Sequence, residues 1–281
     1  MGFEVIDRQL RRAVSSAGSV LDNIGDQVAF YGSAQASFFR VFRRYRSEVL
    51  RQLASVSFGR GALAMVGGTA MIVAFLTGTT GIELAIQGYA QLTNIGIDAL
   101  LGFISAYVNT RIAAPLVTGI ALVATVGAGF AAELGAMRIN EEIDALEVMA
   151  IPSIPYLVTT RVIAGLIAVT PLYAISLVMS YVLTRLTTTL LYGQSPGTYD
   201  HYFQTFLVPR DILSSFVVVL VMGVVIILVN CYYGYRAAGG PEGVGEAVGR
   251  AVRLSLVGVM FVALGMSLIL YGNSNTLHIS R

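Results

Sequence analysis

The chain has 281 residues, of which 56% are hydrophobic and 12% are charged, and its formal net charge is +2. This composition excludes an ordinary soluble domain and a disordered chain. The single cysteine excludes an internal disulfide, and all 18 basic residues are arginine. A Walker A loop needs a lysine on the nucleotide phosphates, so this chain cannot hold one. We therefore expect no cofactor in this chain, and we expect any ATP hydrolysis to occur in another subunit.

The N-terminal region, residues 1–60, contains nine arginines and no long apolar run. Within it, apolar residues recur at intervals of three and four, which predicts one face of a helix. Arginines occupy most of the remaining surface, as is typical of a helix lying in the membrane interface. Packing against a partner's cytoplasmic domain is the alternative. The apolar face consists of Phe38, Phe42, Tyr45, Val49, Leu53 and Val56.

Residues 61–272 contain five apolar segments, each long enough to cross a bilayer, which takes about 20 residues. The sequence therefore predicts an all-α, polytopic membrane protein with an N-terminal amphipathic interfacial helix and five transmembrane helices. We expect the spans at residues 61–81, 96–132, 160–184, 211–232 and 251–272.

The distribution of arginine predicts the orientation of these spans. With the N-terminus in the cytoplasm, 14 arginines fall in cytoplasmic segments and 4 fall on the other side. We therefore expect a multi-pass protein of the cytoplasmic (inner) membrane, with a C-terminal tail, residues 273–281, outside it. Residues 185–210 then form an extracytoplasmic loop rich in aromatic side chains.

The segment between the second and third predicted spans is strongly acidic. It places five carboxylates within the 15 residues 133–147. Each carboxylate at a bilayer centre costs roughly 2.5–3.5 kcal/mol on insertion scales, so this segment must lie in water. We predict a single cytoplasmic helix over residues 133–150.

Helical spacing places Glu133, Glu141 and Asp144 on one side of that helix, and Arg138 can pair with Glu142 one turn later. From charge alone, a solvated face is the plainer interpretation. The functional interpretation is a short helix that docks into a groove on an ATPase and transmits the closure of that ATPase. The candidate coupling residues are Glu133, Arg138, Glu141, Glu142, Asp144 and Glu147.

A glycine-rich stretch precedes the last predicted span. Its glycines could free backbone amides to bind phosphate at a helix start, but the spacing matches no nucleotide motif, and Glu242 and Glu246 oppose an anion. We predict a turn packed beside the acidic helix. The residues of this cytoplasmic turn are Gly240, Glu242, Gly243 and Gly245.

Small residues recur at intervals of four in the second predicted span, at Gly127, Ala131 and Gly135. This spacing permits close contact between membrane helices. Catalysis finds little support, because the two histidines lie outside the predicted spans, and we expect no metal site. No carboxylate falls in the middle of a predicted span, which argues against proton- or sodium-coupled transport.

Two motifs carry a resemblance to a known family. The stretch AAELGAMRINEEIDALEVMAIPSIPYLVTTR resembles the signature of the MlaE/YrbE permease family, with its acidic E-x-I-D-A-L cytoplasmic loop. The stretch YGYRAAGGPEGVGEAVGRAVRLS resembles the family's second signature, a glycine-rich turn before the last helix. The likeness covers most of the chain.

The resemblance implies a permease subunit of an ABC-type Mce lipid transporter and favours the coupling interpretation of the acidic helix. It implies a paralogous YrbE permease subunit, a dimer of cytoplasmic ATPases that bind ATP and Mg²⁺, and a hexamer of MCE proteins as partners. Membrane lipid (fatty acid, mycolic acid, sterol or phospholipid) is the implied substrate, and no nucleic acid is expected. A non-ABC membrane scaffold or channel is the alternative.

The sequence departs from the common family form directly after the acidic helix. That form reads roughly M-G-I-D-P-I-R-Y-L-V-V-P-R, whereas this chain has Ala150 in place of the glycine, Pro152 in place of the aspartate, and Thr160 in place of the later proline. This divergence resembles the actinobacterial branch, and we expect a YrbE subunit of type B. Neither the lipid nor the residues that line its path can be read from the sequence.

Overall fold

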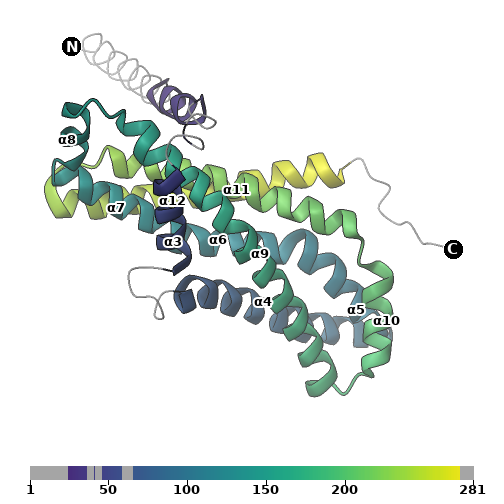
Figure 1. Cartoon of the computed structure of the whole chain (residues 1–281). Coiled ribbons are helices and arrows are strands. Elements are labelled where there is room, and N and C mark those ends of the chain that lie inside the picture. The colour runs from purple at the N-terminus through teal and green to yellow at the C-terminus, as the bar shows by residue number, and fades with distance from the viewer. Residues whose placement is uncertain (1–24, 37–40, 42–45, 59–65, 273–281) are drawn as a thin grey trace, which may run out of the picture.

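A computed structural model describes residues 25–36, 41, 46–58 and 66–272 of the chain (Figure 1). Every regular element in these residues is helical, so the predicted all-α fold class is confirmed. Within the described residues, five helical stretches are long and apolar enough to cross a membrane, as the sequence predicted. Phe38, Phe42 and Tyr45 lie outside the described residues, as does the side chain of Val56.

The first span is α4, Val66–Asn94. The second comprises η1 (Asp98–Leu100), α5 (Leu101–Ile104), η2 (Ser105–Ala113), α6 (Ala114–Leu122), η3 (Val123–Gly127) and α7 (Ala128–Ile139). The third comprises η4 (Ile154–Thr159), α9 (Thr160–Leu186) and η5 (Thr187–Leu191), and the last two are α11 (Pro209–Tyr235) and α12 (Gly240–Tyr271). The shorter helices are α3 (Arg46–Phe58), α8 (Glu142–Val148) and α10 (Pro196–Phe206).

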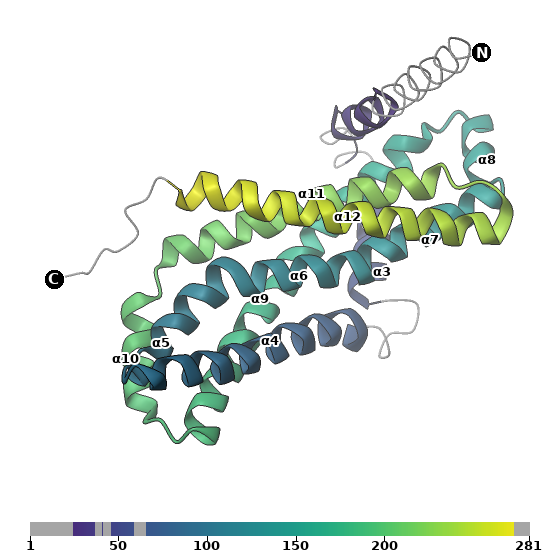
Figure 2. The same cartoon turned by 180° about the vertical axis from the view of Figure 1, so that it is seen from behind.

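The long helices run side by side, and the connecting helices gather at the two ends of this bundle (Figures 1 and 2). One end carries α8 and is called the α8 end, and the opposite end carries α10 and is called the α10 end. Proline at the first turn of α10, α11 and α12 starts each helix, because its missing N–H is not needed there.

The first span differs from its predicted bounds, because α4 continues past residue 81 to Asn94. Glu83 and Gln87 interrupt the apolar run, but they are one helical turn apart and Gln87 Nε2 donates to Glu83 Oε1 at 2.8 Å. Glu83 therefore lies within a membrane-spanning helix. Glu83 lies beyond the bounds predicted for the first span, so the expectation that no carboxylate falls in the middle of a predicted span stays a prediction.

Close backbone contacts hold α4 against α9. A Cβ at Gly81 would lie 2.5 Å from the Ser180 carbonyl oxygen, so only glycine permits this approach. Thr184 Oγ1 donates to the buried carbonyl of Gly81 at 2.9 Å. Small residues play this part in membranes because lipid provides no hydrophobic force between helices.

At the α10 end, an exposed ion pair attaches α10 to the third span. Arg185 donates to both carboxylate oxygens of Asp200 at 2.7 Å. These hydrogen bonds hold the pKa of the Asp200 carboxyl below its usual value. Beside it, Tyr199 is buried, and burial raises the pKa of its phenol to about 12.

The N-terminal helices pack on the chain itself. Val49 of α3 is 5% exposed and lies in a small cluster with Val41, Ile163 and Ala164, against which Leu53 also packs. The apolar face of α3 therefore contacts α9, which neither sequence interpretation of this helix had included.

The helical segment 25–36 lies at the α8 end (Figure 1). Its Phe30 ring lies 5.4 Å from the ring of Tyr232 and 5.6 Å from that of Tyr235, near the end of α11. Asp26 forms an ion pair with Arg236 at 3.0 Å, and the Ala34 carbonyl accepts a hydrogen bond from Thr159 at 3.0 Å. The segment thus joins the ends of the third and fourth spans.

Candidate functional site

The acidic segment forms two helices that meet at a corner, so the single helix predicted over residues 133–150 was wrong. α7 ends at Ile139, and α8 begins at Glu142. Between them Glu141 adopts a left-handed backbone conformation with φ of 59°, which turns the chain. Glu133 and Asp144 consequently do not share one helical face.

A second turn ends α8. The Ile151 N–H bonds the Leu146 carbonyl and the Ala150 N–H bonds the Glu147 carbonyl, both at 3.0 Å. This pair of bonds is the Schellman arrangement, whose left-handed position is usually glycine. Here Ala150 occupies it with φ of 57°, which costs a non-glycine residue roughly 1–2 kcal/mol. The alanine that replaces the family's glycine at residue 150 therefore occupies the left-handed position of this turn.

One side of α8 is anchored and the rest is exposed. Ile143 is fully buried in the core, and it fixes α8 to the bundle. Glu141, Glu142 and Asp144 are exposed, and so are Val148 and Met149, at 88% and 61%. This part of the chain therefore presents three carboxylates and two apolar side chains at its surface.

Arg138 pairs across the corner rather than along a helix. Its Nη1 lies 2.6 Å from Asp144 Oδ1, so the predicted pairing of Arg138 with Glu142 was wrong. The corner brings Asp144 back toward α7, and Arg138 thereby holds α8 at its angle. Neither Glu141 nor Glu142 has an ion-pair partner among the described residues.

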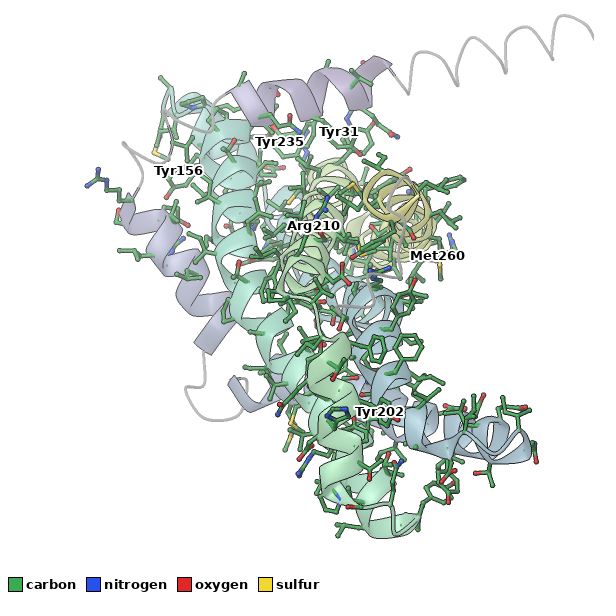
Figure 3. All side chains as sticks on the ribbon, turned by 90° about the vertical axis from the view of Figure 1, so that its right-hand side faces the viewer. Tyr31, Tyr156, Tyr202, Arg210, Tyr235 and Met260 are labelled. Atoms are coloured by element: carbon green, nitrogen blue, oxygen red, sulfur yellow. The ribbon has the colours of Figure 1, made fainter. Side chains whose placement is uncertain are left out.

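Glu147 contacts the chain itself. Its Oε1 accepts hydrogen bonds from Ser153 Oγ at 2.8 Å and from Tyr235 OH at 3.2 Å. The hydroxyl oxygens of Ser153 and Tyr235 are themselves 2.8 Å apart. These contacts connect α8 to the start of the third span and to the end of α11. Figure 3 shows Tyr235 at the same end of the molecule as Tyr31, far from Tyr202 of α10.

Glu133 lies on α7, away from the exposed face of α8. Its Oε2 is 3.0 Å from Nη2 of Arg161, whose side chain is 1% exposed. Arg161, Ser153 and Tyr235 were not among the residues predicted for the site. The available signal was the presence of polar side chains at the ends of apolar spans, but their partners are distant in the sequence.

A shallow pocket of about 380 Å³ lies beside α8. Glu147, Pro152, Ser153 and Pro155 contribute to its lining. A pocket next to an exposed helix can receive a side chain from a docked protein.

The three small residues predicted to pack helices lie where η3 and α7 meet α11 and α12. A Cβ at Gly127 would lie 2.7 Å from the Asn230 amide nitrogen, and one at Gly135 would lie 2.7 Å from a methyl group of Val244. Ala131 is fully buried. Its backbone approaches α11 so closely that a Cβ at Gly234 would lie 2.6 Å from its carbonyl oxygen.

The glycine-rich turn is shorter than predicted. Gly239 and Gly240 have φ of 94° and 73° and form the corner between α11 and α12. Glu242, Gly243 and Gly245 lie inside α12, so their assignment to a turn was wrong. The reason is that Pro241 starts the helix early, which a count of glycines did not reveal.

A second cavity, of about 270 Å³, lies near the α10 end between α6, α11 and α12. Its lining is mostly apolar, with Leu116, Met222 and Met260 among its members, and Arg111 is its charged residue. The Arg111 guanidinium donates to Asp211 Oδ2 at 2.7 and 2.9 Å, so this buried charge is compensated. Figure 3 shows Met260 on the outer side of α12. Among the described residues, no cluster of His, Cys, Asp or Glu could hold a metal ion.

Comparison with known proteins assigns the family. A model of the permease MlaE family matches residues 58–269. The chain belongs to this family.

Similar named proteins support this family assignment. A probable ABC transporter permease protein of Synechocystis is 31% identical, with 74% of this chain and 79% of that protein covered. The chloroplastic protein TRIGALACTOSYLDIACYLGLYCEROL 1 of Arabidopsis thaliana is 33% identical over 72% of this chain, and this alignment spans 57% of the plant protein. A probable ABC transporter permease protein of Rickettsia conorii is 29% identical over 90% of this chain and 92% of that protein. The chain is thus a multi-pass permease of the ABC transporter class, rather than an ATPase.

The start of α12 generates a prediction with a matched control. A Cβ at Gly243 would lie 1.8 Å from the Ala238 carbonyl oxygen, whereas nothing lies within 4 Å of one at Gly245. We expect Gly243→Ala to distort the α11–α12 corner and lower the thermal stability of the purified protein. Gly245→Ala should keep or raise that stability, because alanine in a helix interior is favoured over glycine by about 1 kcal/mol. Equal melting temperatures for the two variants would contradict the corner geometry.

Proposed function

We propose that the chain is the permease subunit of an ABC-type lipid transporter and that α8 is its contact with a separate ATPase. The observation that carries this proposal is the form of α8: Ile143 anchors it, while its carboxylates and its apolar tip are exposed. Family membership supports it, because permeases of the ABC class are the membrane subunits of ATP-driven transporters. The same membership favours a permease over a non-ABC scaffold or channel.

The exposed side of α8 fits a docking contact in both its charge and its shape. Glu141 and Glu142 present two carboxylates without an ion-pair partner in the described part of the chain. Val148 projects at 88% exposure and offers an apolar anchor of the kind that fills a partner's pocket. Glu147 and Arg138 instead hold α8 in place, so a force applied to α8 reaches the spans.

The partners follow from this function. A dimer of cytoplasmic ATPases would bind ATP and Mg²⁺ and grip α8, and a second permease, paralogous or identical, would complete the membrane core. We infer an Mce system of the YrbE type with a hexamer of MCE proteins on the outer face. The departure at Ala150 remains the support for an actinobacterial subunit of type B.

The substrate is proposed to be a lipid: a fatty acid, mycolic acid, sterol or phospholipid. The apolar cavity between α6, α11 and α12 supports this class. At about 270 Å³ it is smaller than sites for drug-sized ligands, which span about 300–1,000 Å³. It would therefore hold part of a lipid chain while the remainder lies along the bundle.

The orientation is proposed to place the α8 end in the cytoplasm. The excess of arginine in the segments assigned to that side supports it. The described residues contain five candidate spans, an odd number, so the C-terminal tail, residues 273–281, which lies outside the described residues, is proposed to be extracytoplasmic.

Reversing the charges that face outward on α8 should weaken the contact with the ATPase. We expect Glu141→Arg with Glu142→Arg to lower the amount of ATPase retained by the purified permease by about tenfold or more, because unfavourable charge juxtaposition costs several kcal/mol. Co-purification in detergent and the thermal stability of the permease are the measurements.

Two controls accompany this variant. Glu141→Gln with Glu142→Gln removes the charges without reversing them and should give an intermediate loss. Asp98→Arg reverses a charge near the α10 end and should leave ATPase retention unchanged. Wild-type retention by the double reversal would refute the assignment of α8.

Filling the cavity near the α10 end should slow transport without loosening the complex. Leu264 lines this cavity, so we expect Leu264→Trp to lower ATP-dependent lipid movement severalfold in reconstituted vesicles while assembly is preserved. Val178→Trp places the same bulk on α9, where Val178 is 56% exposed, and serves as the control. Normal transport by Leu264→Trp would exclude this cavity from the lipid path.

The orientation can be tested with an impermeant maleimide. Cys231 is fully buried and should not react, so introduced cysteines report alone. We expect Ser195→Cys to be labelled on intact cells, and Val148→Cys to be labelled only on inverted vesicles stripped of peripheral proteins. The reverse pattern would overturn the arginine-based orientation.

A further inference from the structure

Arg161 pairs with Glu133 in the site described above, and the burial of its charge is extreme. Its side chain is 1% exposed, and it lies in the first turn of α9, directly after η4. Arginine cannot lose its proton in a protein. The charge must therefore be compensated within the fold.

The negative charge that compensates Arg161 lies on α7. Glu133 Oε2 lies 3.0 Å from Arg161 Nη2 and is the carboxylate that pairs with it among the described residues. The remaining contacts are weaker: Arg161 Nη1 donates to the Leu157 carbonyl at 2.9 Å, and Nη2 lies 3.8 Å from Met137 Sδ. Because the Arg161 guanidinium is buried, moving Glu133 away would leave that charge without a paired carboxylate among the described residues.

The pair spans the base of the acidic loop. Glu133 precedes α8 on the second span, and Arg161 follows α8 on the third. On the other side of the loop, Glu147 contacts Ser153 and Tyr235. The contact with Tyr235 connects the loop to α11. A displacement of α8 would thus act on α7 and α9 together.

We propose that Arg161 is a positioning residue that makes the second and third spans move as one body when α8 is displaced. This inference rests on the proposed function, because it assumes that an ATPase displaces α8. In this role Arg161 acts through Glu133 rather than by direct contact with substrate or nucleotide.

A structural role and a positioning role predict different results for Arg161→Met. Arg161→Met removes the buried charge itself and leaves Glu133, whose side chain is 46% exposed, solvated, so no uncompensated charge stays buried. A structural role therefore predicts normal coupling in a stable protein. A positioning role predicts a stable protein in which ATP hydrolysis no longer moves the spans.

The experiment uses the complex of the full chain with its ATPase and follows Ser267→Cys, which lines the cavity near the α10 end. The probe is the rate at which a maleimide labels this cysteine, measured with and without trapping of the nucleotide by vanadate. Cys231 is buried and stays silent. We expect Arg161→Met to keep its melting temperature and ATPase rate while the nucleotide-dependent change in labelling falls by roughly tenfold.

Three further variants sharpen the result. Arg161→Lys keeps a charge opposite Glu133 and should restore part of the change. Arg250→Met removes an exposed ion pair with Glu246 and should have no effect. If Arg161→Met fails to assemble, Glu133→Gln decides, because it keeps a hydrogen-bond acceptor but removes the compensating charge: a reduced change supports the proposal and an unchanged one overturns it.

An unaltered labelling change in assembled Arg161→Met would overturn the positioning role. A wild-type complex that shows no nucleotide-dependent change at all would instead refute the proposed function. The two failures are therefore distinguishable in the same assay.

Discussion

The close approach of α7 to α11 and α12 is the contact on which the α8 end of the molecule depends. Lipid surrounds such helices without driving them together, so close packing and polar links must hold them. Gly127, Gly135 and Gly234 supply the packing, since a Cβ at each would lie within 2.7 Å of a neighbouring helix. The polar link comes from Asn230, which donates to Ser255 Oγ at 2.8 Å and joins α11 to α12. With α7 fixed in this way, the acidic corner can project beyond the spans at a defined place.

The corner itself combines firm attachment with exposure. Ile143 enters the core, Arg138 holds Asp144 at 2.6 Å, and Glu147 contacts Ser153 and Tyr235. These contacts use one side of α8 and leave Val148 and the carboxylates before it exposed. Because the attachments reach the second, third and fourth spans, a push on α8 is passed to most of the bundle. This is the arrangement that a helix needs if it is to convert the closure of an ATPase into movement within a membrane.

The number of spans and the location of the acidic loop could be predicted from the sequence, because hydropathy and charge are local properties. The corner could not. Glu141 and Ala150 both have positive φ, and neither residue type signals a left-handed conformation. The early start of α12 at Gly240 was hidden by glycines that belong to the helix. Some predicted coupling residues are exposed, and others bond within the chain. Which of them bond depends on side-chain partners such as Arg161 and Tyr235. Those partners lie far along the chain and meet only after the spans have packed.

A photocrosslinking amino acid at Val148, followed by identification of the chain that it captures in native membranes, would show directly whether α8 contacts an ATPase. Val148 is 88% exposed on α8 and makes no contribution to the core, so the replacement should not disturb the fold. We predict capture of a peripheral subunit that carries a Walker A motif and hydrolyses ATP. Capture of lipid alone, or of an extracytoplasmic protein, would contradict it.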